Sequence, residues 1–179
     1  PGTRANTAQT AIIVPVRLPA ALARLRKAEV DVARLGVSAH VTIRYPFIDS
    51  SRLGSLEIET VASIVAAQPS VAIEFTQVRR WPASDLGHGV VWLQPDPGEP
   101  FRELTRAIWA AFPEAPPYGS PDIDLEPHLT IASDDPAHFD DVESAASDHV
   151  PFRRLVKEAT LIVEGPAGRW RTGHRFPLG

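Results

Sequence analysis

The chain has 179 residues, with 18 basic and 22 acidic side chains and a net charge of −4. This length suits one domain, or two small lobes that share a core, and no apolar run approaches the roughly 18 residues of a membrane span. The net negative charge argues against a protein that binds a long nucleic-acid duplex through contacts to many phosphates. It allows a small phosphorylated ligand or a short RNA end. The absence of cysteine excludes disulfides, thiolate zinc sites and a cysteine nucleophile, and fits the cytoplasmic location that we expect.

Predicted strands and helices alternate through the first half of the chain. Residues 1–10 are expected to form an N-terminal tail, and residues 11–179 a single bilobal domain. Pro15 lies in the first predicted strand and favours a sheet edge or a strand end for it. The hydrophobic periodicity predicts a strand over 11–17, a helix over 19–35, a strand over 39–45, a helix over 54–67, and strands over 71–78 and 89–93. A loop that contains Trp81 and Pro82 is expected to join the last two strands.

The second half begins with the clearest amphipathic helix, over 99–112. A Pro/Gly-rich stretch over 113–127 fits no regular element, and we interpret it as a long loop of the kind that often covers a site. A strand over 128–132, a helix over 136–146 and a closing hairpin formed by 152–163 and 169–176 follow. This order predicts an α+β fold with largely antiparallel sheets flanked by helices.

One four-residue pattern occurs twice. Residues 40–43 are His-Val-Thr-Ile and residues 128–131 are His-Leu-Thr-Ile, and each copy lies in a predicted strand between two long helices. In a strand, residues two apart share a face, so His40 and Thr42 are expected on one face and their apolar neighbours on the other. His128 and Thr130 repeat this arrangement. A duplicated lobe would give such a repeat.

The repeated pattern supplies groups suited to phosphoryl transfer. Imidazole titrates near neutral pH, so that one histidine can accept a proton while its twin donates one. A threonine hydroxyl can donate a hydrogen bond to a non-bridging phosphate oxygen. If the two strands are neighbours, or are related by pseudo-symmetry, two imidazoles and two hydroxyls meet at one cavity.

A single His-x-Thr strand would usually be structural, but the second copy favours a site. The other four histidines (His88, His138, His149 and His174) share no pattern, and no spacing typical of a metal site is present. A P-loop, a nucleophile elbow and a dinucleotide fingerprint are also missing from the sequence. We therefore expect neither a metal nor a cofactor.

The motif pair resembles the 2H phosphoesterase superfamily, and within it the bacterial 2′-5′ RNA ligase-like branch. The first copy is followed by Tyr45-Pro46-Phe47 and the second is preceded by Pro127. The opening strand, the strand at residues 90–93 and the closing segment at 169–176 are similar in order, so that the resemblance covers most of the chain from about Ile12. It implies a bilobal, pseudo-symmetric duplication in which the two motifs face each other in a central cleft.

The resemblance also implies a reaction. One histidine would activate water or a 2′-hydroxyl, the other would protonate the departing oxygen, and Thr42 and Thr130 would hold the phosphate. The substrate would be a nucleotide 2′,3′-cyclic phosphate, a 2′-5′ phosphodiester or an RNA end, with no obligate protein partner. Family analogy makes His128 the base and His40 the acid in hydrolysis. A non-catalytic nucleotide- or RNA-binding module that retained the cleft is the alternative, and a purely structural duplication is a third reading.

Four further residues are candidates for substrate contacts: Arg44, Tyr45, Trp92 and Tyr118. Arg44 is predicted to continue the polar row roughly 7 Å beyond Thr42 if the strand stays regular to Tyr45. There its planar fork would suit phosphate oxygens. The alternative is an arginine at the rim that is solvated or paired with a nearby acid.

Overall fold

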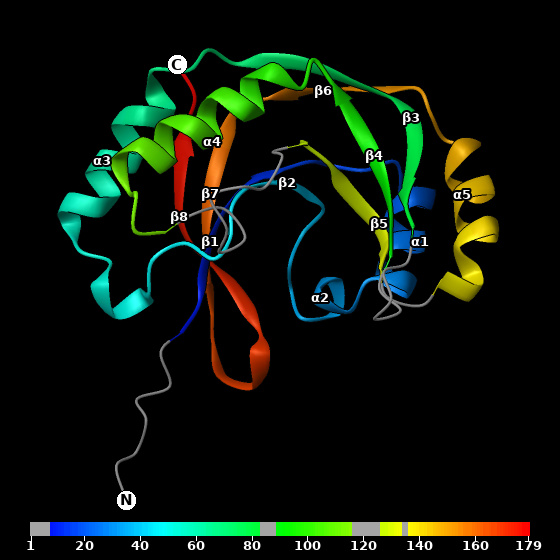
Figure 1. The fold of residues 1–179 in the computed structure, drawn as a ribbon, viewed down its shortest axis with the longest axis horizontal. Helices are drawn as coiled ribbons and strands as arrows, with labels where there is room; N and C mark the ends of the chain where they lie inside the picture. Colours follow the sequence, from blue (N-terminus) through cyan, green and yellow to red (C-terminus); the bar gives the residue numbers. More distant parts are fainter. Residues whose placement is uncertain (1–7, 83–88, 116–125, 134–135) are drawn as a thin grey trace, which may run out of the picture.

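The computed structural model of the protein describes residues 8–82, 89–115, 126–133 and 136–179. Within them, eight strands form two four-stranded sheets flanked by helices (Figure 1). The strands are β1 (Thr10–Pro15), β2 (His40–Arg44), β3 (Val71–Trp81), β4 (Val90–Asp96), β5 (Leu129–Ser133), β6 (Phe152–Val156), β7 (Glu158–Glu164) and β8 (Trp170–Pro177). The helices are α1 (Ala20–Glu29), α2 (Asp31–Arg34), α3 (Ser55–Ala66), α4 (Glu99–Ala111) and α5 (Phe139–Ser147), with short 3₁₀ turns η1 (Ser50–Arg52), η3 (Pro136–His138) and η4 (Pro166–Gly168).

The two sheets repeat one plan. The first sheet has the order β2-β1-β7-β8 and the second has the order β5-β4-β3-β6, and all neighbouring strands are antiparallel. Each motif strand, β2 or β5, is an edge strand that pairs with the strand before it in the chain, β1 or β4. Helices α1 and α2 lie between β1 and β2 in the chain, and helix α4 lies between β4 and β5. The predicted α+β fold with duplicated halves is therefore confirmed.

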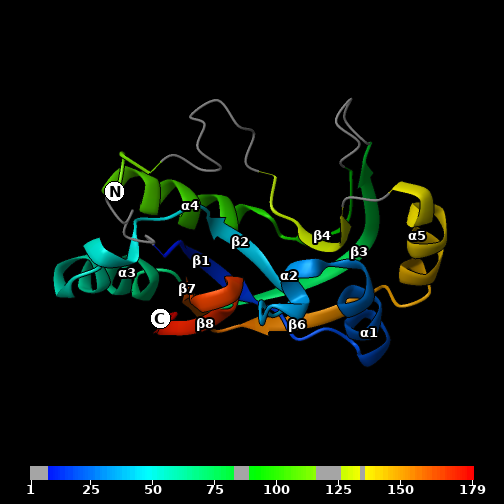
Figure 2. The ribbon, with the colours of Figure 1, turned by 90° about the horizontal axis from the view of Figure 1, so that it is seen from below.

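The helices interlock the two halves. Helices α3 and α4 pack on β8 and β2 of the first sheet, whereas α1 and α5 pack on strands β3, β4 and β5 of the second (Figures 1 and 2). The helix that joins β1 to β2 thus covers the other sheet, and so does the helix that joins β4 to β5. None of the helices in the described residues is long and apolar enough to cross a membrane.

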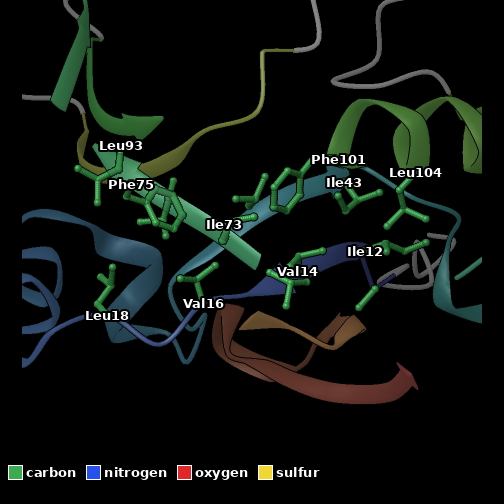
Figure 3. Close-up of a cluster of buried hydrophobic side chains, with 14 of the residues drawn as sticks. Ile12, Val14, Val16, Leu18, Ile43, Ile73, Phe75, Leu93, Phe101 and Leu104 are labelled. Atoms are coloured by element: carbon green, nitrogen blue, oxygen red, sulfur yellow. The ribbon is translucent and has the colours of Figure 1, made fainter. Parts of the chain in front are cut away.

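One hydrophobic core connects both sheets. Side chains from β1, β2, β3, β4 and α4 meet in it, as Figure 3 shows; they include Ile12, Ile43, Phe75, Leu93 and Phe101. The opposite face of β1 is buried as well, because Ala11 and Ile13 belong to a second apolar cluster. Burial on both faces explains the unbroken apolar run of this strand. Pro15 is the last residue of β1, as its missing N–H favours.

The structure corrects three predicted boundaries. The expected helix over 19–35 is interrupted at Val30, whose buried side chain accompanies an extended backbone, so that α2 starts anew at Asp31. The expected strand over 152–163 breaks at Lys157: β6 pairs with β3 in the second sheet, whereas β7 pairs with β1 in the first. Only β7 and β8 form the hairpin. Trp81 does not lie in a loop, because β3 continues to it and pairs it with Val90.

Candidate active site

The two motif strands lie next to each other at the junction of the sheets. β2 and β5 are in contact, although they belong to different sheets. In each strand the two apolar motif residues are fully buried in the core, whereas the histidine and the threonine are only half-buried. The predicted separation of polar and apolar faces therefore holds through His40 and Thr42, and again through His128 and Thr130.

Both imidazoles are held in the same way. The Nδ1 atom of His40 lies 2.7 Å from the carbonyl oxygen of Ser38, and the Nδ1 atom of His128 lies 2.9 Å from that of Glu126. A carbonyl oxygen only accepts, so Nδ1 must donate, and the neutral ring carries its hydrogen there. In both histidines Nε2 is then the nitrogen that can take up a proton and return it.

The two histidines differ in their electrostatic surroundings. Burial lowers the pKa of His40 to about 4, the carbonyl of Ser38 opposes this shift, and the charges of Arg26 and His128 add to it. Burial also lowers the pKa of His128, but there the backbone and the carboxylate of Glu126 both oppose the shift. The surroundings of His40 therefore disfavour the positive form of the imidazole more strongly than those of His128 do.

A one-residue bulge interrupts each motif strand directly after its threonine. Thr42 lies opposite Ile13 but Arg44 lies opposite Ile12, so that Ile43 has no partner of its own. In the second sheet Thr130 lies opposite Trp92 and Ala132 opposite Val91, which leaves Ile131 as the extra residue. The bulges occupy equivalent positions. They shift the alternation of side chains beyond this point in both strands.

Arg44 consequently does not continue the polar row, and the prediction of a regular strand is wrong here. Its side chain is 0% exposed and lies beneath α4. Nη2 donates to the carbonyl oxygen of Phe112 at 3.3 Å, and the guanidinium lies 5.7 Å from the ring centroid of Trp109. Nε and Nη1 have no hydrogen-bond partner in the part of the chain that the structure describes. Arg44 is therefore neither in line with His40 and Thr42 nor solvated at the rim.

An apolar cavity of about 360 Å³ opens beside His40 and Thr42. Its lining includes Ile13, Val37, Ile162, Tyr45 and Trp170. The rings of Tyr45 and Trp170 meet edge to face at 6.2 Å, and the hydroxyl of Tyr45 donates to the side chain of Gln9 at 2.7 Å. The cavity therefore has aromatic and aliphatic walls and a few polar groups, which is typical of a small-molecule site. Tyr45 thus lines the same cavity as His40 and Thr42.

Trp170 forms a wall of this cavity that sequence reasoning missed. The backbone N–H of Trp170 donates to the carbonyl oxygen of Leu35 at 2.8 Å. This hydrogen bond joins the start of β8 to the residue that follows α2. Gly36 follows with a φ of 99°, and a Cβ atom there would come within 2.7 Å of the carbonyl oxygen of Trp170. Glycine is required because no other residue tolerates both the positive φ and the close approach. The only signal in the sequence was an aromatic residue in the closing hairpin.

Aromatic rings also surround His128. Trp92 is only 3% exposed, its ring centroid lies 6.0 Å from that of His128, and its indole N–H has no partner among the described residues. Trp81, which is 36% exposed, lies 4.7 Å from both rings. On this side Trp81 is therefore the exposed ring, whereas the predicted Trp92 is buried beneath it. A predicted strand that extended beyond residue 78 could have brought Trp81 into consideration.

Tyr118, the fourth candidate for a substrate contact, lies outside the described residues. Within the described residues, no group of three or more histidine, aspartate or glutamate side chains is arranged to hold a metal ion.

Comparison with known proteins agrees with this arrangement. A model of the 2′-5′ RNA ligase superfamily matches residues 14–167. The fold is similar to Escherichia coli LigT in complex with 3′-AMP (TM-score 0.57, 17% identity, covering 97% of this chain and 99% of that chain). It is also similar to TT0787 of Thermus thermophilus (TM-score 0.54, 14% identity, covering 94% and 97%). No curated protein sequence matches the chain significantly. Since the family match spans most of the chain, the resemblance is confirmed: the chain belongs to the 2′-5′ RNA ligase superfamily of 2H phosphoesterases.

Proposed function

We propose that the protein is a metal-independent phosphoesterase that opens 2′,3′-cyclic phosphates, or cleaves or forms 2′-5′ phosphodiesters, in nucleotides or RNA ends. One observation carries this proposal: two neighbouring edge strands present equivalent histidines, each fixed through Nδ1 to the carbonyl two residues earlier. Membership of the 2′-5′ RNA ligase superfamily supports phosphoesterase activity on RNA.

The proposed hydrolysis needs one neutral and one protonated imidazole. The neutral ring accepts a proton from water at Nε2 as the water oxygen forms a bond to phosphorus. The bond from phosphorus to the 2′- or 3′-oxygen breaks, and the protonated ring gives its proton to that oxygen. The hydroxyls of Thr42 and Thr130 donate to the non-bridging oxygens, which carry the negative charge throughout. The phosphate monoester and the free hydroxyl are the products. The ring that accepted a proton then releases it to solvent and the other ring takes one up, which restores the starting states of the two histidines.

The electrostatics of this chain favour His40 as the base in ring opening. A pKa of about 4 keeps His40 neutral from mildly acidic pH upward. Burial lowers the pKa of His128 as well, but the backbone and the carboxylate of Glu126 oppose that shift, so His128 holds a proton more readily than His40. This assignment is the opposite of the one that family analogy suggests for hydrolysis. By microscopic reversibility, the roles exchange when the ring or the diester is formed.

The apolar cavity beside His40 is the proposed site of the nucleoside. Its volume of about 360 Å³ and its aromatic walls suit a planar base. A base that packs against the walls formed by Tyr45 and Trp170 would leave its ribose phosphate near Thr42. Crystal structures of Escherichia coli LigT with 3′-AMP and with ATP support a nucleotide ligand for this fold.

The test is turnover of the four 2′,3′-cyclic nucleotides, with the product isomers separated by chromatography. We expect conversion to one phosphate isomer by the intact protein, and by a His149→Ala variant that removes an exposed imidazole. His40→Ala and His128→Ala should each slow conversion by about 10²–10⁴-fold. Binding of these nucleotides in calorimetry without any turnover would instead identify a nucleotide-binding module that retains the cleft.

A further inference from the structure

A buried cation joins the two motif segments. Arg26 of α1 is only 5% exposed, and its guanidinium makes two hydrogen bonds to backbone carbonyls. Nε donates to the carbonyl oxygen of Thr130 at 3.1 Å, and Nη1 donates to that of Val37 at 3.1 Å. These two acceptors are 93 residues apart in sequence, since Thr130 lies in the second motif strand and Val37 precedes the first.

Both carbonyls belong to segments that position the proposed catalytic groups. Thr130 is the proposed phosphate ligand of the second motif. Val37 is directly followed by Ser38, whose carbonyl fixes Nδ1 of His40. A single rigid fork therefore connects the backbone that orients His40 to the strand that carries Thr130 and follows His128.

The charge of Arg26 is not neutralised by an ion pair within the described residues, where none of the salt bridges includes it. Burial lowers its pKa to about 10, which still leaves the guanidinium protonated at neutral pH. The positive charge lies close enough to His40 to lower the pKa of that imidazole. Arg26 thus acts on the site through both its geometry and its charge.

At the corresponding position of the other half, helix α4 carries a threonine in place of this cation. Arg26 is the seventh residue of α1, and the seventh residue of α4 is Thr105; both are buried, as are Leu22 and Phe101 at the third position of each helix. The hydroxyl of Thr105 donates only to the carbonyl of Phe101 within its own helix. The two halves of the site are therefore unequal at this position.

We propose that Arg26 is a positioning residue of the phosphoesterase reaction, which holds the His40 and Thr130 segments in register. The inference rests on the proposed function, since it concerns the same pair of histidines. Arg26 itself is not proposed to touch the substrate. Its charge favours the neutral form of His40, and its two hydrogen bonds fix the separation of the catalytic groups.

Other groups also face His40, and they limit how far the pKa of His40 can change when Arg26 is removed. His128 acts on it from β5, the carbonyl of Ser38 from the preceding segment, and Glu164 of β7 lines the same cavity. Loss of the Arg26 charge leaves burial and the charge of His128 in place. The midpoint of His40 titration should then rise toward its ordinary value without reaching it.

The test compares Arg26→Met and Arg26→Lys with Arg24→Met, a control that removes an exposed arginine from the same helix. Arg26→Met should move the His40 titration midpoint, followed by NMR of the imidazole protons, to higher pH, and the acidic limb of kcat/KM should move with it. Arg26→Lys should keep the midpoint near its original value, because the charge remains. Both variants should lower kcat by about tenfold to a hundredfold, because a displaced catalytic group costs that much, while KM changes little.

An unchanged midpoint and an unchanged kcat in Arg26→Met would overturn the inference. If Arg26→Met does not fold, as judged by circular dichroism, Arg26→Lys decides: full kcat contradicts the positioning role, and a reduced kcat with an unshifted midpoint supports it. If the intact protein turns over no cyclic nucleotide, the proposed function fails. The His40 titration in Arg26→Met still decides the electrostatic role, because NMR needs no substrate.

Discussion

Acidification should destabilise the protein through His40. The pKa of His40 is about 4 in the folded chain, against an ordinary 6.5. The unfolded chain therefore binds more protons between these two pH values, and the free energy of unfolding falls as the pH is lowered through this window. At 1.36 kcal/mol per pKa unit, the linkage amounts to about 2 kcal/mol between pH 7 and pH 5. This loss is a large part of the 5–15 kcal/mol that stabilises a typical domain.

The measurement is urea unfolding of the intact protein and of His40→Gln at pH 7, 6 and 5. Glutamine cannot titrate, so the variant should lose about 2 kcal/mol less than the intact protein over this range. His149→Gln, at an exposed position, is the matched control and should follow the intact protein. If His40→Gln and the intact protein lose stability in parallel, the imidazole of His40 is not held neutral by its surroundings and the reasoning is refuted.

Three further predictions concern the site and its surroundings. The profile of kcat/KM against pH should rise as His40 loses its proton near pH 4, and it should fall as His128 loses its proton below pH 6.5. An optimum at or above pH 7 would contradict the assignment of His40 as the base and His128 as the acid. Trp170→Ala should raise KM for cyclic mononucleotides about tenfold, with a smaller effect on kcat, because it removes a wall of the base cavity; an unchanged KM would place the base elsewhere. Arg44→Ala should lower the thermal midpoint and leave KM unchanged, because Arg44 is buried under α4, and a raised KM with an unchanged midpoint would restore it to the site.

Much of the fold could be predicted because it depends on local periodicity. The alternation of β2 and β5 follows from residues two apart, so the polar face of His40 and Thr42 was visible in the sequence. The sheet to which a strand belongs was not, since β6 and β7 are separated by one residue and pair with different sheets. That choice depends on long-range packing, such as the stacking of Phe152 on Phe75 at 4.9 Å.

Prediction of the site from the sequence was limited by long-range packing as well. A bulge adds one residue to a strand without a distinctive sequence, so the shift that buries Arg44 could not be read from alternation alone. Arg26 had no visible link to either motif, because its two acceptors are backbone carbonyls in remote segments. The cavity wall at Trp170 depends on an approach to Gly36 across the fold. Each of these features forms only when the two halves of the fold pack against each other.

We propose that His40 and His128 act together as one acid–base pair without a metal. Single-turnover hydrolysis of a 2′,3′-cyclic nucleotide in excess EDTA, by the intact protein, both single alanine variants and the double variant, tests it most directly. Each single variant should lose about 10²–10⁴-fold in rate, and the double variant should be only slightly slower than either, because the pair acts as a unit. Near-normal rates in either single variant, multiplicative losses in the double variant, or activity of the intact protein that EDTA abolishes and a divalent ion restores would contradict the account.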